Sequence, residues 1–200
     1  MRILAFSDLH RSASAVRNVI EASGEADVLV AAGDFGVRGE GEPDTVTLLK
    51  QCGKPVVMVH GNHDRPAELA ALCADWKNGH HLHGEVVILD GITFMGLGGE
   101  IPHRNDAEWN VSESEKSAAA LLEQAGTARV LVTHAPPFGS ADLQKDGSHH
   151  GSTAIYEFIR HLQPDLCLCG HIHHSWGETD QIGRTWVQNL GPTVNRFDIK

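Results

Sequence analysis

The chain has 200 residues, with 26 Asp or Glu against 16 Lys or Arg, so its formal net charge is −10. This acidic balance argues against a protein that grips long nucleic acid or docks on anionic lipid, because the mean field would repel both. The shares of hydrophobic (41%) and charged (21%) residues are ordinary for a globular protein, and the length suits one domain over residues 1–200.

Short apolar runs rich in Val, Ile and Leu, separated by Gly, Asp and Pro, predict β-strands along the whole chain. The runs are 2–6, 27–32, 55–59, 85–90, 92–97, 129–133, 165–169, 185–190 and 194–199. Helical patterns predict helices over 12–23, 66–76, 112–125 and 153–162. Ser112 and Glu115 have the spacing of a capping box, and Ser152 suits the N-cap of the last helix.

The order of these elements predicts an α/β fold. Strands and helices alternate in the first half, as in βαβ units around a buried sheet. A hairpin over 85–97, turning at Asp90-Gly91, and a strand-rich tail after Gly170 break the alternation. We therefore expect two stacked sheets flanked by helices, an αββα layering, with 98–111 as a candidate active-site loop.

The sequence predicts neither export nor a membrane span. Its apolar runs are too short for a bilayer, and the first residues turn acidic at Asp8, too early for a signal peptide. The four cysteines lack the spacing of a disulfide scaffold or a zinc knuckle, which favours buried, inert thiols. We expect a reduced, cytoplasmic location and no membrane partner.

Fourteen histidines, almost as many as all lysines and arginines together, direct attention to metal binding. Open α/β sheets bind ligands beyond the carboxyl ends of their strands. Five predicted strand ends here carry Asp8, His10, Asp34, Asn62, His63, His134, His171 and His173. The pairs Asp8/His10 and His171/His173 are spaced two apart, so continued strand geometry would project both members of a pair to one side.

The chemistry of these side chains predicts two metal ions. Imidazole, carboxylate and amide oxygen suit borderline divalent metals such as Mn, Fe, Ni or Zn, and the ligands exceed what one ion needs. Two divalent ions bring four positive charges, of which Asp8 and Asp34 neutralise only two. The surplus is available to a hydroxide and a phosphate, as two-metal displacement requires.

In this order the motifs resemble those of the calcineurin-like metallophosphoesterase family. That family carries D-x-H, G-D, G-N-H-[D/E], H and G-H-x-H, and the matching segments here are 8–10, 33–34, 61–64, 134 and 170–173. The resemblance implies a four-layer αββα sandwich of two mixed sheets. The segments 133–139 and 170–177 are similar to small members described as phosphodiesterases.

The resemblance also implies roles for single residues. One metal would be held by Asp8, His10, Asp34 and His173, and the other by Asp34, Asn62, His134 and His171. Asp34 would bridge the two ions, and a bridging hydroxide would attack phosphorus in line. His63 would stabilise the phosphoryl group and protonate the leaving oxygen as a general acid, which is worth about 10²–10⁴ in rate.

One segment departs from the phosphoprotein phosphatases of this superfamily. Those enzymes carry G-D-x-x-D-R-G, in which the second Asp supports the acid histidine, whereas Val37 stands at that position here. The departure argues against a close protein-phosphatase relative. Arg38 is a candidate phosphate contact, with a solvated loop arginine as the equal alternative. His150 is a candidate substrate contact because it precedes a helix whose N-terminus could receive an anion.

Other residues near the motifs have structural explanations. Asp64 precedes Arg65-Pro66 and is predicted to cap a helix. Trp109 is predicted to anchor the long loop by packing, with stacking on a base as the alternative. The remaining histidines are predicted to lie in a loop, at strand edges or on the surface: His80, His81 and His83 in the loop, and His60, His161 and His174 elsewhere.

The function that these observations favour is two-metal hydrolysis of a phosphoester, most of all a phosphodiester, with Mn as the favoured metal. The substrate would be a small phosphoester or a nucleotide-like molecule. One alternative is a phosphomonoesterase on the same site. Another is a non-catalytic scaffold, because a retromer subunit of this fold binds proteins and has a degraded metal site. Repair nucleases of this fold carry a DNA-binding cap, for which we expect no residues here.

Overall fold

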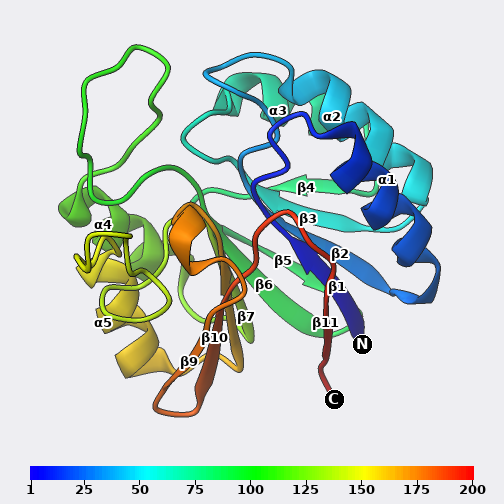
Figure 1. The fold of residues 1–200 in the computed structure, drawn as a ribbon. Helices are drawn as coiled ribbons and strands as arrows, with labels where there is room; N and C mark the ends of the chain where they lie inside the picture. Colours follow the sequence, from blue (N-terminus) through cyan, green and yellow to red (C-terminus); the bar gives the residue numbers. More distant parts are fainter.

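Two β-sheets pack face to face in the computed structural model, which describes residues 1–200 (Figure 1). In sheet order, the first contains β11 (Asn195–Asp198), β1 (Arg2–Phe6), β2 (Val28–Ala32), β3 (Val56–Val59) and β4 (Gly79–His81). The second contains β5 (Glu85–Leu89), β6 (Ile92–Leu97), β7 (Val130–Thr133), β8 (Leu166–Cys169), β10 (Thr185–Asn189) and β9 (Thr179–Ile182). Both sheets are mixed: β11, β5 and β9 pair antiparallel with their neighbours, and the other pairings are parallel.

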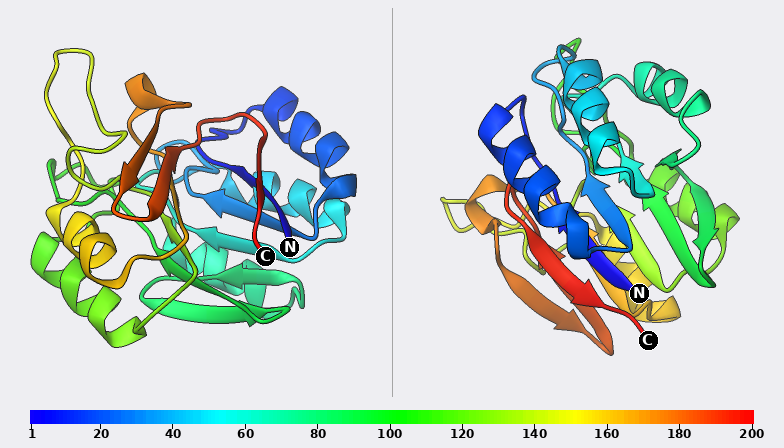
Figure 2. Two further views of the ribbon diagram at one scale, coloured as in Figure 1. Left: turned by 90° about the horizontal axis from the view of Figure 1, so that it is seen from below. Right: turned by 90° about the vertical axis from the view of Figure 1, so that its right-hand side faces the viewer.

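Helices cover the outer face of each sheet. On the first sheet lie α1 (Ala13–Ala22), α2 (Glu42–Leu49) and α3 (Pro66–Ala74), and on the second α4 (Glu115–Ala125) and α5 (Thr153–Leu162) (Figures 1 and 2). The arrangement is the predicted four-layer αββα sandwich. The two chain ends lie side by side because β1 pairs with β11 (Figure 2).

Alternation along the strands produces this layering. On β1, Ile3 and Ala5 belong to the core between the two sheets, whereas Leu4 and Phe6 belong to the core beneath the helices. A strand that is buried on both faces is apolar at every position, and successive side chains point to opposite sides. The buried sheets therefore form a rigid base whose strand ends carry the motif residues.

One α-helix and two strands have no counterpart in the prediction from sequence. α2 buries Glu42 and Thr45 beside two apolar residues, so it lacks a clear apolar stripe. β4 contains one glycine and two histidines, and β9 is a polar, mostly exposed edge strand. None of the three carries the hydrophobic periodicity on which the prediction depends.

The predicted capping box is wrong. The N-cap of α4 is Ser114, whose side chain accepts the backbone N–H of Ser117. Glu115 instead reaches the N-terminus of α5, where its carboxylate accepts the N–H groups of Thr153 (2.9 Å) and Ala154 (2.8 Å). A carboxylate at a helix N-terminus is favoured by the helix dipole, so this contact ties the two helices together.

No helix is long and apolar enough to span a bilayer. The cytoplasmic location stays a prediction. All four cysteines are free; Cys167 and Cys169 are buried, as expected, whereas Cys52 and Cys73 are only half-buried. Burial raises the pKa of Cys167 to about 12, which keeps that thiol protonated and unreactive.

Candidate metal centre

The predicted ligands meet at one edge of the molecule, beyond the carboxyl ends of β1, β2, β3, β7 and β8. We call this group the rim cluster: Asp8, His10, Asp34, Asn62, His134, His171 and His173. At its first position, one ligand atom from each of Asp8, His10, Asp34 and His173 lies within 4.8 Å of the other three. The Nε2 atoms of His10 and His173 are 3.3 Å apart, and His173 Nε2 lies 3.5 Å from Asp8 Oδ1.

The predicted second position would lie between Asp34 and the side chains of Asn62, His134 and His171. Oδ2 of Asp34 is 3.5 Å from His10 Nε2 and also 3.5 Å from His134 Nε2. His134 Nε2 is 3.1 Å from Asn62 Oδ1, and the rings of His134 and His171 have centroids 5.0 Å apart. Asp34 is thus the carboxylate that faces both positions.

Two imidazoles are oriented by backbone carbonyls. Nδ1–H of His10 donates to Gly36 O (3.0 Å), and Nδ1–H of His134 donates to Ala32 O (2.8 Å). Because a carbonyl oxygen only accepts, the neutral ring carries its lone pair on Nε2. Burial, followed by the charge of His171, lowers the pKa of His134 to about 3, so this ring is neutral near pH 7. Fixing the ring through the other nitrogen is the usual support for a metal-ligating histidine.

The rim cluster concentrates buried negative charge. Burial and the neighbouring carboxylates of Asp64 and Asp8 hold the pKa of Asp34 well above its ordinary value. Burial also acts to raise the pKa of Asp8, but hydrogen bonding with His173, the charge of His134 and the Ser7 hydroxyl lower it to about 2. Buried carboxylates facing imidazole lone pairs are a donor set for a cation, and oxygen with nitrogen suits borderline divalent metals. The residues therefore fit the predicted ions.

Turns, rather than continued strands, present the ligands. β1 ends at Phe6 and β8 at Cys169, so the expected continuation of strand geometry through Asp8/His10 and His171/His173 is wrong, although Asp8 and His10 do converge on one position. Asp8, His10, Asp34 and His171 instead have φ between +42° and +67°. This left-handed region is costly for residues with a side chain, and such strain gathers at functional sites.

Two glycines allow the strand-end loops to approach one another. A Cβ on Gly33 would lie 2.7 Å from His134 Nδ1 and 2.6 Å from the backbone nitrogen of Gly61. A Cβ on Gly61 would collide with the carboxylate of Asp34. The glycine before each motif residue is therefore a requirement of close packing.

Asp64 does not cap a helix. The N-cap of α3 is Arg65, which makes no side-chain cap, and Asp64 is fully buried. Its carboxylate accepts the backbone N–H groups of Asp34 (2.8 Å), Gly36 (2.8 Å) and Gly61 (2.7 Å). Asp64 thus ties the loop after β2 to the loop after β3 and holds Asp34 beside Asn62.

His63 lies beside the first position without joining it. Its ring is 5.1 Å from that of His10, centroid to centroid, and stacks on Trp109 at 4.5 Å. The backbone N–H of Arg38 donates to His63 Nδ1 (2.9 Å), which places the proton of the neutral ring on Nε2. Burial, then the charge of His10, lowers the pKa of His63 to about 4. Near pH 7, His63 is a neutral ring that donates through Nε2.

The two candidate substrate contacts differ. The exposed side chain of Arg38 lies 5.8 Å from the centre of the Trp109 ring, and both residues line a cavity of about 440 Å³ beside His63. His150 is half-buried, and its carbonyl accepts from Arg104, but its ring makes no hydrogen bond with the rim cluster. The expected anion site at the N-terminus of α5 is already filled by Glu115. The structure therefore places Arg38 next to His63, whereas a substrate contact by His150 stays a prediction.

Three other histidines form a second group, the β4 histidine cluster: His60, His81 and His83. His60 is buried, and its Nδ1 lies 3.1 Å from His81 Nε2. The predicted loop is wrong for His80 and His81, which both lie on β4, whereas His83 lies in the bend after it. His60, predicted at a strand edge or on the surface, directly follows β3 and is buried, so the surface position is wrong. His161 and His174 are exposed as predicted.

Glu100 and Asn110 are two polar residues at the centre that the sequence argument missed. Both belong to the loop after β6, the element predicted as a candidate active-site loop. Oε1 of the buried Glu100 lies 3.7 Å from His171 Nε2, and Asn110 bonds to Asn62. β6 lies next to β7 in the sheet. Applying the strand-end argument to β6 would have identified Glu100.

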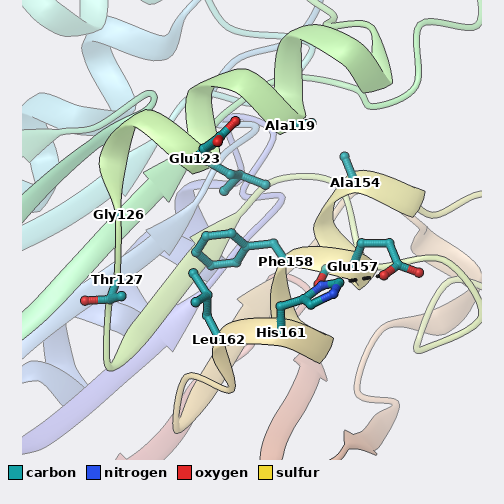
Figure 3. A pocket seen from close by; sticks show the side chains of 10 residues that line it. Ala119, Glu123, Gly126, Thr127, Ala154, Glu157, Phe158, His161 and Leu162 are labelled. Atoms are coloured by element: carbon teal, nitrogen blue, oxygen red, sulfur yellow. Dashed lines mark hydrogen bonds and ion pairs between the residues drawn. The ribbon is translucent and has the colours of Figure 1, made fainter.

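The largest cavity lies elsewhere. A groove of about 560 Å³ runs between α4 and α5, and its lining includes the apolar side chains of Ala154, Phe158 and Leu162 and the polar ones of Glu157 and His161 (Figure 3). No member of the rim cluster lines it. The candidate functional site is the rim cluster, since that is where the ionisable groups converge.

Comparison with known proteins agrees with the motifs. The family model for calcineurin-like phosphoesterases matches residues 1–175. The match confirms the resemblance read from the five motifs and the predicted class of enzyme, a metal-dependent phosphoesterase.

Two curated relatives bear phosphodiesterase names. The chain is 27% identical over 162 residues to a cAMP/cGMP dual specificity phosphodiesterase of Mycobacterium tuberculosis, an alignment covering 76% of this chain and 50% of that protein. It is 24% identical over 179 residues to a probable cyclic nucleotide phosphodiesterase of Synechococcus sp., covering 86% of this chain and 67% of that protein. The chain thus spans half to two thirds of the length of these relatives.

Solved structures share the fold. A protein of Thermus thermophilus superposes with a TM-score of 0.73 at 19% identity, covering 100% of this chain and 99% of that one. The phosphopantetheinyl hydrolase of Mycobacterium tuberculosis superposes with a TM-score of 0.62 at 18% identity, covering 95% and 89%. At these identities the likeness concerns the fold alone, and it agrees with the αββα sandwich.

Proposed function

The chain belongs to the calcineurin-like phosphoesterase family, and on that premise we propose that it hydrolyses small phosphodiesters with two divalent metal ions. The observation that carries the proposal is the position of Asp34, whose Oδ2 lies 3.5 Å from an imidazole nitrogen of each metal position. Bound divalent ions would supply Lewis-acid charge to a phosphoryl oxygen and lower the pKa of a bound water.

The residues of the chain would have two roles in this reaction, binding of the metal ions and contact with the substrate. Asp8, His10 and His173 would hold the first ion and Asn62, His134 and His171 the second, with Asp34 shared between them. His63 stands outside both sets. Its ring is neutral near pH 7, so its Nε2–H is proposed to stabilise the phosphoryl group by a hydrogen bond. Protonation of the leaving oxygen would require the doubly protonated ring, which is the minor form near pH 7 because the pKa of His63 is about 4. Trp109 covers one face of the His63 ring, which limits its rotation and its access to water.

The surroundings of the centre support a diester as substrate. A monoester dianion requires more positive charge than a diester monoanion. Two arginines, Arg38 and Arg65, line the adjoining cavity, and Arg65 is paired with Glu68, which leaves Arg38 as the one without a carboxylate partner there. Trp109 and the exposed Trp176, whose ring lies 4.1 Å from that of His173, offer apolar faces for an organic ester group. Relatives named as cyclic nucleotide phosphodiesterases support the same substrate class for this chain.

The direct test loads the full chain with Mn²⁺, the metal that we favour, and measures hydrolysis of bis-p-nitrophenyl phosphate. We expect turnover that requires metal and is lost on chelation. His103→Ala is a suitable control, because His103 lies in the same loop as Glu100 but contacts Ser112 and Asp106 rather than the rim cluster. A chain that binds two ions and hydrolyses no phosphoester would contradict the proposal and favour the scaffold alternative.

A further inference from the structure

A chain of hydrogen bonds leads from the second metal position into the loop after β6. Asn62 Nδ2 donates to Asn110 Oδ1 (3.0 Å), and Asn110 Nδ2 donates to Glu100 Oε2 (2.8 Å). The other oxygen of Glu100 lies 3.7 Å from His171 Nε2. This series of hydrogen bonds therefore begins at Asn62 and ends beside His171, and both residues belong to the second metal position.

The carboxylate sets the direction of both amides. An ionised carboxylate only accepts, so Asn110 must turn its NH₂ group toward Glu100 and its oxygen toward Asn62. Asn62 must then turn its own NH₂ group toward Asn110, which leaves Oδ1 facing His134 Nε2 at 3.1 Å. Both of these atoms present lone pairs, as a metal position requires. The backbone carbonyl of Asn105, which also only accepts, takes a second hydrogen bond from Asn110 Nδ2 (3.2 Å), so the two acceptors together hold Asn110 in this orientation. Without Asn110, the Asn62 amide loses its acceptor and can rotate by half a turn to present N–H groups instead.

The loop is built to hold this arrangement. Glu100 and Asn62 are each 5% exposed and Asn110 is half-buried, so the hydrogen bonds between them are partly shielded from water. The backbone N–H of Glu100 donates to Val111 O, and the N–H of Val111 donates to Asn62 O, both at 3.0 Å. The two ends of the loop are thereby fastened to each other and to the loop after β3.

We propose that Glu100 and Asn110 are positioning residues for the second metal position: they orient Asn62 so that its oxygen, and not its nitrogen, faces the ion. This inference rests on the proposed function, because it requires the two-ion site. Residues that orient metal ligands typically account for about 10- to 100-fold in metal affinity. Removing the hydrogen bonds between Glu100, Asn110 and Asn62 should therefore lower the affinity for the second ion by about 10- to 100-fold and leave the affinity for the first ion unchanged.

The test is a titration of the metal-stripped full chain with Mn²⁺ alone, followed by electron paramagnetic resonance of the loaded protein. For Asn110→Leu, which has a similar shape without hydrogen-bonding groups, we expect the first ion to bind as in the wild type. The second should bind about 10- to 100-fold more weakly. The spectrum should change from that of a spin-coupled pair to that of a single ion. His103→Ala should behave as the wild type in both measurements.

A second variant guards against misfolding of the first. Glu100→Gln keeps an acceptor for Asn110 but can also donate, so it holds the amide less firmly, while the carbonyl of Asn105 still accepts from Asn110 Nδ2. We therefore expect a smaller loss of second-ion affinity than for Asn110→Leu. Wild-type affinity for the second ion in either folded variant would overturn the inference. An equal loss for both ions would also overturn it, because it would indicate a general structural role. A wild-type chain that binds only one ion would overturn the proposed function itself.

Discussion

The molecule contains two histidine clusters that differ in what surrounds them. In the rim cluster, His10 and His134 each donate one ring N–H to a backbone carbonyl and turn the other nitrogen toward a carboxylate. In the β4 histidine cluster, His60 pairs with His81, and only His83 approaches a carboxylate, that of Glu113 at 3.6 Å. The first arrangement collects ligand atoms, whereas the second satisfies buried polar groups.

The difference teaches that a histidine count does not locate a metal site. Carboxylates on neighbouring strand ends, and carbonyls that fix the tautomer, separate the ligands from the packed rings. His83 shows the reverse case, because its Nδ1 accepts the backbone N–H of Gly98 and the proton of its neutral ring lies on Nε2. This contrast predicts that substitutions in the rim cluster cost metal and activity, whereas substitutions in the β4 histidine cluster cost stability.

The largest effect is expected from Asp34→Asn. Asparagine tolerates the left-handed backbone at this position (φ +57°), but its neutral amide cannot serve two cations. We expect elemental analysis to find that the paired site is lost and turnover to fall to background. Because burial and neighbouring carboxylates raise the pKa of Asp34, removing its charge should leave the metal-free protein at least as stable. A variant with two bound ions and wild-type turnover would contradict the shared role.

The next effect concerns the histidine that stands beside the metals. For His63→Ala we expect both ions to remain and turnover on diesters with poor leaving groups to fall by about 10²–10⁴. The deficit should shrink for p-nitrophenolate, which leaves without a proton. His161→Ala, at an exposed position on α5, is the control. An equal deficit for all leaving groups would restrict His63 to stabilising the phosphoryl group through Nε2–H.

A smaller effect on kcat/KM is expected from exchanging a diester substrate for a monoester. We predict that kcat/KM for bis-p-nitrophenyl phosphate exceeds that for p-nitrophenyl phosphate by about tenfold or more at one pH and metal, a difference of ~1.4 kcal/mol in barrier. Both substrates release the same leaving group, so the ratio reports the charge that the centre accepts. Arg38→Gln should lower the activity on the monoester more than on the diester. A higher kcat/KM for the monoester would favour the phosphomonoesterase alternative on the same site.

Most of the fold follows from patterns that are visible in the sequence. Buried parallel strands such as β2 and β8 are runs of apolar residues bounded by glycine or aspartate, and their order predicts the two sheets. Elements stabilised by tertiary contacts are different. β4 forms because its backbone pairs with β3, and Glu115 caps α5 rather than its own helix. Contacts between distant segments determine both features, and no local pattern predicts them.

The residues of the candidate site also divide into those that the sequence predicts and those that only the folded structure reveals. Strand ends identified the ligand types, because parallel strands bring their carboxyl ends to one edge. The supporting residues could not be found from spacing: Asp64 holds three backbone N–H groups from two loops, and Asn110 reaches Asn62 across 48 positions of sequence. The backbone of Arg38, which fixes the tautomer of His63, carries no side-chain signal at all. The residue types that can bind a metal are therefore visible in the sequence, whereas the orientation of their side chains depends on contacts in the folded protein.

The smallest effect should come from the β4 histidine cluster, and it concerns stability rather than metal. For His81→Gln, which keeps a hydrogen-bonding partner for His60, we expect two bound ions and kcat/KM within about twofold of the wild type, as for a change away from the site. Burial, then the charge of His83, lowers the pKa of His81 to about 4, below its ordinary 6.5. Protonation therefore favours the unfolded chain, and the contribution of this group to stability, complete above pH 6.5, is lost as the pH falls toward 4. Urea unfolding should show that the free energy of unfolding falls between pH 7.5 and pH 5 in both proteins. The fall should be smaller for His81→Gln than for the wild type, by about 1 kcal/mol. Loss of an ion in this variant would contradict the contrast between the two clusters.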